Sequence, residues 1–446
     1  MTKQDIPKSS IEELRHRIEV GSASRQDYCD LAYHIAAIGE YERAIKYYEQ
    51  ARSLCRQDIE KVHVDVELAA VLRMVYRQPE VNRLAENALS LLSRQDETAE
   101  VLLGRGAAYA LLADNAATTD SKRSIEMGRL GLEALKCTMA MRTDCATLSS
   151  ACVWAMRIHH LLGDTEQTIR GCNQCLQYEL DERVRLDCQV TLIEALRIQG
   201  QLVEAERVID EVDRYLGAKA QYSQSDKRIV QMFELERGLV QRLSNRFAEA
   251  ATTFRQMLIA IENDPSLQQP PSMLGTVWWN LAIVLQESLD YSGAAAAFEK
   301  AMALYESDGP EYCKMMRALG DCFFEIGADA KARDCYEKVL ASPASEEIER
   351  LNARAGIARF WYESRDFRQA AFLFEALLTQ YQNDDPTHYH ILLWLGNCYE
   401  GMQQPDTARE RFRLIVTSTL ARHKDRISAQ AALLRLSTAG GSQVSH

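Results

Sequence analysis

The chain has 446 residues, of which 47% are hydrophobic and 26% are charged, and its formal net charge is −12. This composition is that of an ordinary folded protein, and the negative charge disfavours whole-surface binding to nucleic acid or to an anionic membrane. No stretch approaches the roughly 18 consecutive apolar residues of a membrane span. The N-terminus lacks the apolar core of a secretory signal, and the 12 cysteines fall in helical patterns. We therefore expect a cytoplasmic protein with reduced thiols.

Taken in chain order, the predicted elements are all helices. Residues 1–24 form a polar lead-in with an extra helix over 10–19. A helix, a short polar break and a second helix then recur along 25–216 and again along 228–420. Residues 421–446 contain a closing helix over 424–437 and a polar tail. The clearest copies of the recurring pattern are 31–51, 281–301, 319–339 and 395–415.

This recurring pattern resembles the tetratricopeptide repeat. That family places small residues at positions 8, 20 and 27 and large residues at positions 4, 7, 11 and 24 of a helix pair. In the same register the chain divides into ten lengthened repeats. They start at Arg25, Val62, Ala99, Ser149, Leu186, Gln231, Gly275, Cys313, Leu351 and Tyr389.

The composition at fixed positions supports this register. Position 8 is Ala or Gly in eight of the ten repeats. Position 20 is Ala in seven repeats: Ala44, Ala205, Ala250, Ala294, Ala332, Ala370 and Ala408. Position 24 is aromatic in six: Tyr48, Phe254, Phe298, Tyr336, Phe374 and Phe412. Small residues let two helices approach closely, and a large ring fills the remaining space. The resemblance implies an all-α, right-handed solenoid superhelix of stacked antiparallel helix pairs.

Several segments depart from the pattern. Repeat 4 has Thr168 and Cys172 at positions 20 and 24, which predicts an irregular pair. Insertions are expected at 113–123 inside repeat 3 and at 217–227 and 262–272 between repeats. We interpret them as surface loops rather than dedicated binding loops, with hinges between rigid sub-arrays as the alternative.

Catalytic signatures are missing from the sequence, which has no Gly-rich phosphate loop, zinc-protease helix motif or nucleophile elbow. We therefore expect neither enzymatic activity nor a cofactor. The adjacent His159 and His160 point about 100° apart on a helix, which does not suit one metal ion. These two, and the pair His388 and His390, are interpreted as structural or solvent-facing.

The Cys-x-x-Cys formed by Cys172 and Cys175 is the most enzyme-like local pattern. Its spacing puts both thiols on one helix face, and Cys152 and Cys188 fall in helices expected to pack beside it. A zinc site or redox switch is therefore conceivable. However, both thiols occupy core positions of the repeat, and free cysteine behaves as a small buried hydrophobe. Core thiols are the favoured interpretation, and no metal site is predicted.

The family resemblance also implies where a partner would bind. The first helix of each repeat lines the concave side, with positions 2, 5, 9 and 12 facing the groove. The late repeats place cationic, aromatic and amide side chains there, which suit an extended or helical peptide with acidic and apolar side chains. The candidates are Trp279, Lys314, Arg317, Phe324, Arg359, Tyr362 and Asn397. The early groove is more apolar and would suit a helix; its residues include Cys29, Tyr33, Val66 and Leu103.

The leading functional hypothesis is a non-enzymatic scaffold or adaptor that binds a protein or peptide in this groove. One alternative is a regulatory sensor that releases an effector when a peptide or protein signal binds. Another is a metal or redox protein that uses the thiols around Cys172. A chaperone co-factor is disfavoured: of the carboxylate-clamp residues of the family, Asn280 and Lys314 match, whereas the positions held by Leu235, Leu239 and Ala318 do not.

Overall fold

The structure is a computed structural model that describes residues 8–37, 39–117, 119–141, 143–180, 182–217, 224–263, 271–305, 309–381 and 386–441. All regular elements in these ranges are helices, so the predicted all-α solenoid of helix pairs is confirmed. The chain divides into two compact units. Unit 1 comprises Met1–Thr253 and Ile259–Gln268, and unit 2 comprises Phe254–Leu258 and Gln269–His446.

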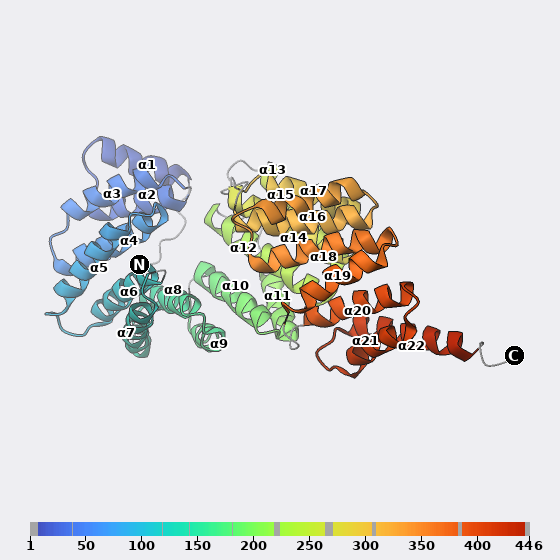
Figure 1. Cartoon of the computed structure of the whole chain (residues 1–446). Helices are drawn as coiled ribbons and strands as arrows, with labels where there is room; N and C mark the ends of the chain where they lie inside the picture. The colour runs from blue at the N-terminus through green and yellow to red at the C-terminus, as the bar shows by residue number, and fades with distance from the viewer. Residues whose placement is uncertain are drawn as a thin grey trace. The chain divides into compact units, whose positions relative to one another are not determined.

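Unit 1 is a stack of helix pairs in which each pair packs on the next (Figure 1). The pairs are α2 with α3, α4 with α5, α6 with α7, α8 with α9, and α10 with α11, preceded by α1 and followed by α12. The bounds are α1 (Lys8–Glu19), α2 (Arg25–Ala37), α3 (Tyr41–Ser53), α4 (Asp58–Met74), α5 (Gln78–Leu92), α6 (Ala99–Ala116), α7 (Ser121–Ala140), α8 (Cys145–Leu161), α9 (Thr165–Cys175), α10 (Glu182–Ile198), α11 (Leu202–Gly217) and α12 (Gln224–Leu243).

Unit 2 repeats the same arrangement (Figure 1). Its pairs are α14 with α15, α16 with α17, α18 with α19, and α20 with α21, and α22 covers the last pair. The bounds are α14 (Pro271–Glu287), α15 (Tyr291–Met302), α16 (Pro310–Glu325), α17 (Asp329–Ala341), α18 (Glu347–Glu363), α19 (Phe367–Leu378), α20 (Pro386–Gly401), α21 (Pro405–Thr417) and α22 (His423–Gly441). The remaining helix, α13 (Phe247–Asn263), contributes residues to both units.

The turn inside each pair tests the predicted register independently. In nine of the ten repeats, a residue with positive φ stands two positions after the first helix, at position 15 of the register. These residues are Gly39, Tyr76, Gly163, Gly200, Asn245, Leu289, Gly327, Arg365 and Gln403. A left-handed residue at this point ends the first helix and reverses the chain. Nine identical turns mean that the repeats share one register.

The small and large positions pack as predicted. The seven alanines at position 20 are fully buried, and the six rings at position 24 are at most 2% exposed. Two glycines mark the tightest approach. A Cβ on Gly320 of α16 would lie 2.8 Å from Cε1 of Tyr336, and a Cβ on Gly356 of α18 would lie 2.4 Å from Cζ of the same ring. The Tyr336 ring is therefore sandwiched between two first helices.

Repeat 3 has no turn of the common type, because α6 continues through position 15 of the register, Ala113, and ends at Ala116. The predicted insertion 113–123 overlaps the end of α6 and the start of α7, so most of it is helix. The register resumes later in the chain. A Cβ on Gly106, at position 8, would lie 2.5 Å from Cγ of Leu135, and Gly131 contacts Ile158 of the next repeat. Gly131 and Leu135 thus take the parts of positions 20 and 24.

Repeat 4 is regular, so the prediction of an irregular pair was wrong. Helices α8 and α9 pack side by side with the common turn at Gly163. Thr168 is tolerated at position 20 because its Oγ1 donates a hydrogen bond to the carbonyl of Asp164, 2.9 Å away, which satisfies the buried hydroxyl. The other two predicted insertions, 217–227 and 262–272, lie largely outside the described residues.

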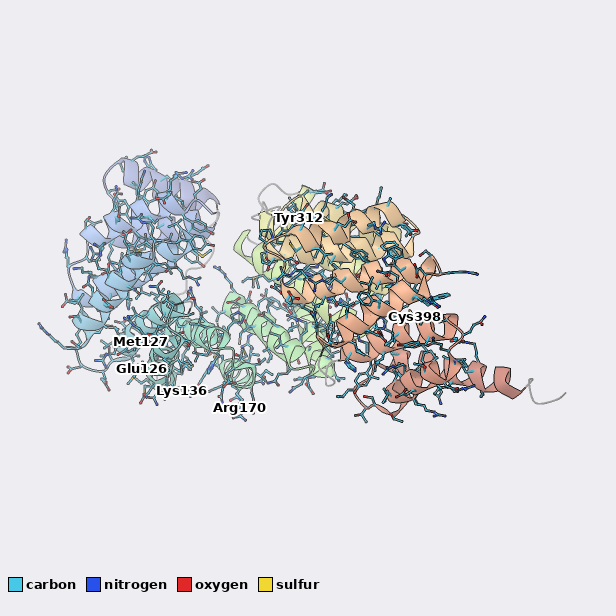
Figure 2. The ribbon with its side chains drawn as sticks, in the orientation of Figure 1. Glu126, Met127, Lys136, Arg170, Tyr312 and Cys398 are labelled. Atoms are coloured by element: carbon cyan, nitrogen blue, oxygen red, sulfur yellow. The ribbon has the colours of Figure 1, made fainter. Side chains whose placement is uncertain are left out.

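The two terminal helices exist as predicted, with longer bounds. α1 packs on α2, and α22 packs on α21 and α20 through the buried Ala429 and Ala432. The opposite face of α22 exposes apolar side chains among polar ones: Ile427 is 53% exposed and Leu434 is 68% exposed. Lys136 of α7 and Arg170 of α9 are examples of exposed polar side chains on second helices (Figure 2).

Candidate functional site

All seven predicted site residues lie on first helices of unit 2, and all are half-buried. They are distributed over four consecutive repeats. The residues are Trp279 on α14, Lys314, Arg317 and Phe324 on α16, Arg359 and Tyr362 on α18, and Asn397 on α20. Their common placement follows from the shared register of the repeats.

Arg317 lies at the centre of an ion-pair network between α16 and α18. Its Nε is 2.6 Å from Oε2 of Glu349, and its Nη1 is 2.5 Å from Oδ2 of Asp321. Tyr336 donates its hydroxyl to Oδ1 of Asp321 at 2.6 Å. Burial opposes the charge of Arg317, but the two carboxylates outweigh it and raise the pKa of its guanidinium above the ordinary value. Two of the donors of Arg317 are therefore already engaged within the protein.

Arg359 joins the same network from α18. Its Nη2 is 2.6 Å from Oε1 of Glu325, and its Nη1 is 4.0 Å from Oδ1 of Asp321. Its guanidinium carbon lies 4.0 Å from the ring centroid of Phe324 and 5.4 Å from that of Trp394. Its Nε is buried and has no hydrogen-bond partner. Arg359 thus stacks between two rings, which favours a fixed orientation.

The network makes this surface less cationic than the sequence indicates. Lys314 pairs with Oε1 of Glu346 at 3.1 Å, so three cations face four carboxylates: Asp321, Glu325, Glu346 and Glu349. An acidic ligand group must compete with these carboxylates. Sequence reasoning missed the pairing because Glu346 and Glu349 lie about one repeat after their partners.

Aromatic rings continue the surface from α16 to α20. Phe324 meets Phe360 at a centroid distance of 5.1 Å, and Tyr362 meets Trp394 at 5.2 Å. Trp279 on α14 contacts Tyr305 edge-on at 6.3 Å. Trp394 and Tyr305 were not among the predicted residues. We define the inner face of unit 2 as the seven predicted residues together with Asp321, Glu325, Glu349 and Trp394.

His390 on α20 links Trp394 of the inner face to Asp425 through hydrogen bonds. Trp394 donates its Nε1 hydrogen to Nε2 of His390 at 3.2 Å, so Nδ1 of a neutral His390 carries the proton. Nδ1 lies 3.1 Å from Oδ1 of Asp425, which is 2% exposed. The interpretation of His390 as a structural residue agrees with this geometry.

The four cysteines around Cys172 are core thiols. Cys152, Cys172, Cys175 and Cys188 are at most 1% exposed and belong to one hydrophobic cluster. A hydrogen bond with Cys175 and burial raise the pKa of Cys152; a hydrogen bond with Cys172 and burial raise that of Cys188. Thiols with raised pKa values are poor nucleophiles and poor metal ligands.

Among the described residues, no group of three or more His, Cys, Asp or Glu side chains is arranged to hold a metal ion. None of the described helices combines the length and the apolar character needed to span a membrane. Of the paired histidines, His159 is 7% exposed and packs against Gly171, and the side chain of His160 is 62% exposed near Glu194.

Comparisons with known proteins agree with the predicted repeats. Models of the tetratricopeptide repeat match residues 273–343 and 391–418, which fall on the predicted repeats 7, 8 and 10. The chain therefore contains tetratricopeptide repeats. A search of curated protein sequences found no match.

Solved structures show the same fold. The apo form of RapI has a TM-score of 0.59 and 10% identity, covering 84% of this chain and 98% of that chain. The apo form of the quorum sensor NprR from B. thuringiensis has a TM-score of 0.50 and 13% identity, covering 67% of this chain and 82% of that chain. At identities this low, the similarity shows a shared fold and nothing more.

Proposed function

We propose that this protein is a non-enzymatic cytoplasmic scaffold or adaptor that binds a protein or peptide segment on the inner face of unit 2. One observation carries the proposal: the consecutive first helices α16, α18 and α20 present half-buried aromatic and charged side chains that contact one another across repeats. A continuous surface of this kind suits an extended or helical segment.

The chemistry of the surface suggests how the segment is held. Phe324, Tyr362 and Trp394 offer ring area, which gives contact at low entropy cost. Among the carboxylates paired with arginine, Glu325 is the most replaceable, because its side chain is 37% exposed, against 26% for Asp321 and 11% for Glu349. A ligand carboxylate that takes its place would keep Arg359 paired. The proposed segment is therefore mainly apolar, with an acidic group near Arg359.

The experiment compares affinity capture from native lysate by three forms of the protein, followed by mass spectrometry. The test variant is Tyr362→Ala with Asn397→Ala, which alters two consecutive first helices and breaks none of the ion pairs described above. The matched control is Phe372→Ala, which removes a ring that is 65% exposed on α19. We expect partners captured by the wild type and the control to be lost by the test variant. Equal capture by all three forms would refute binding on this face.

A second candidate is a regulatory sensor, favoured by the ion pairs that link consecutive repeats. Lys314 to Glu346, Arg317 to Glu349 and Glu325 to Arg359 all join α16 to α18 or to its N-cap. A ligand that replaces one of these partners alters the coupling of the two repeats. One protein of similar fold is described as a quorum sensor. Hydrogen exchange of α16–α18 with the captured partner distinguishes the two: a scaffold protects only the contacted helix, whereas a sensor changes exchange throughout both repeats.

A further inference from the structure

A second charged cluster lies in unit 1, on the first helices of three consecutive repeats. Arg73 in the last turn of α4 and Arg157 on α8 both donate to the same atom, Oδ2 of Asp114 on α6. The Nη1 of Arg73 is 2.5 Å from this oxygen, and the Nη2 of Arg157 is 3.3 Å from it. Two guanidinium groups therefore share one carboxylate, whereas the three cations on the inner face of unit 2 pair with four carboxylates.

The hydrogen-bonding capacity of this cluster is not filled. The Nε of Arg73 is buried and has no partner, and the side chain is 32% exposed overall. Arg157 makes one hydrogen bond within the described residues, to Asp114, and its side chain is 27% exposed. Buried polar groups without partners are rare, since each one costs free energy. Because both side chains are partly exposed, an acceptor from outside the chain can pair with their remaining Nη hydrogens.

The local electrostatics agree with this geometry. Burial, followed by the positive charge of Arg73, lowers the pKa of Arg157 to about 10, and the single Asp114 compensates only in part. One further negative charge placed between the two arginines would neutralise the excess. A carboxylate fits because an arginine can donate two parallel hydrogen bonds to it.

An aromatic ring, that of Trp154, lies beside the guanidinium group of Arg157. The guanidinium carbon of Arg157 is 5.2 Å from the ring centroid of Trp154, one turn earlier on α8. Trp154 is half-buried and packs against the hydrophobic clusters of the early and the middle repeats. It gives an incoming chain an apolar surface beside the charged groups.

The cluster occupies groove positions of the repeat. Arg73 and Arg157 stand at positions 12 and 9 of their repeats. Position 9 of repeat 1 is Tyr33, whose ring lies 5.5 Å from the guanidinium carbon of Arg183 on α10. Three helix pairs separate α2 from α10 in the chain, yet these two helices are in contact. The first helices of unit 1 therefore come together on the side that carries position 9.

We propose that Arg73 and Arg157 together bind a carboxylate of a peptide ligand, with Asp114 holding the two guanidinium groups and Trp154 contacting the neighbouring apolar side chain. The proposal rests on the proposed peptide-binding function and assigns it a second site. The carboxylate is either the C-terminus of the peptide or a Glu or Asp side chain. The sequence prediction that this groove is mainly apolar overlooked both arginines.

The test uses the immobilised full chain and three synthetic random hexapeptide libraries, all N-acetylated. The first library is amidated and contains no Asp or Glu. The second differs from it only in a free C-terminal carboxylate, and the third only in one Glu per peptide. Retained peptide is measured by mass spectrometry. We expect the wild type to retain the second or the third library at least about tenfold better than the first.

The variants separate ligand binding from a structural role. Arg73→Gln with Arg157→Gln should abolish the preference for carboxylate. Arg73→Lys with Arg157→Lys keeps both charges, and hence the attraction to Asp114, but loses the paired N–H donors; it should lose most of the preference even if the Gln variant is poorly folded. Arg170→Gln is the matched control, since this side chain is 65% exposed on α9 and pairs with Glu166 (Figure 2). It should behave as the wild type.

Each outcome decides between the sites. An unchanged preference in both double variants, or no preference in the wild type, would overturn the carboxylate site. The Tyr362→Ala, Asn397→Ala variant is run beside them. Loss of retention in that variant alone would support the inner face of unit 2 and overturn this site. Loss in the arginine variants alone would support this site and count against the inner face. The library retained identifies the source of the carboxylate.

Discussion

The packing of Tyr336 between α16 and α18 makes Gly356→Ala an informative substitution. In an exposed helix interior, replacing Gly by Ala stabilises the helix by about 0.5–1 kcal/mol. Here the new Cβ would stand 2.4 Å from Cζ and 2.6 Å from Cε2 of the Tyr336 ring. Carbon atoms pack best at about 3.5–4.0 Å, so the ring or the helix must move by roughly 1 Å.

The ring cannot move freely. Its hydroxyl is bound to Asp321, and on the α16 side the Cβ position of Gly320 is only 2.8 Å from Cε1. Overpacking of this kind typically costs about 1–3 kcal/mol, which exceeds the gain in helix propensity. We expect Gly356→Ala to lower the free energy of unfolding by about 1–2 kcal/mol, with the effect concentrated in α16–α18.

The assay is native-state hydrogen exchange of peptides from α16, α17 and α18, supported by urea unfolding. The control repeats the substitution in a Tyr336→Leu background, where the ring is absent. There Gly356→Ala should be neutral or stabilising. A stabilising effect of Gly356→Ala in the otherwise wild-type chain would refute the close approach and the packing argument built on it.

Three further predictions concern other parts of the chain. At pH 7, iodoacetamide should modify the exposed Cys137 before Cys188, because the raised pKa of the buried thiol leaves little thiolate; mass spectrometry would show equal rates if this reasoning is wrong. Burial raises the pKa of Glu234 to about 7 from its ordinary 4.5, even with Nη1 of Arg237 at 3.2 Å. The folded protein therefore loses stability as pH rises from 4.5 through 7, and Glu234→Gln should remove this loss of up to about 3 kcal/mol; parallel urea curves of the two proteins from pH 4 to 8 would contradict it. Asp425→Ala removes the acceptor for Nδ1 of His390 and should cost about 1–3 kcal/mol, seen as faster hydrogen exchange in α22, whereas unchanged exchange would mean that the pair is not stabilising.

The repeat architecture could be predicted because it rests on residues that act locally. An alanine at position 20 and a ring at position 24 specify the crossing of one helix pair, and Ala332 with Tyr336 illustrates the rule. The register failed in repeat 3, where the insertion is mostly helix. Gly131 and Leu135 take the parts of positions 20 and 24, and they lie thirteen residues later than counting from Ala99 predicts. The prediction that Thr168 makes repeat 4 irregular was wrong because its hydroxyl donates a hydrogen bond to a backbone carbonyl, which a sequence pattern does not show.

The candidate site could be predicted only in part. The position of a residue within a repeat decides which face it occupies, so all seven candidates share one face. Their electrostatic state depends on the next repeat, because Glu349 reaches Arg317 from a helix that starts about 30 residues later. The arginines of unit 1 were missed for the same reason. Only the juxtaposition of α4, α6 and α8 shows that Arg73 and Arg157 share Asp114.

The turn at position 15 bears on how such proteins diverge. Five of its nine occurrences use a residue other than glycine, among them Tyr76, Leu289 and Arg365. The left-handed conformation is therefore imposed by the packing of the two helices and does not depend on one residue type at the turn. A chain built in this way can exchange its turn residues, and can gain or lose whole pairs by duplication or deletion, while the fold persists. Two solved structures that are only 10% and 13% identical to this chain share its fold.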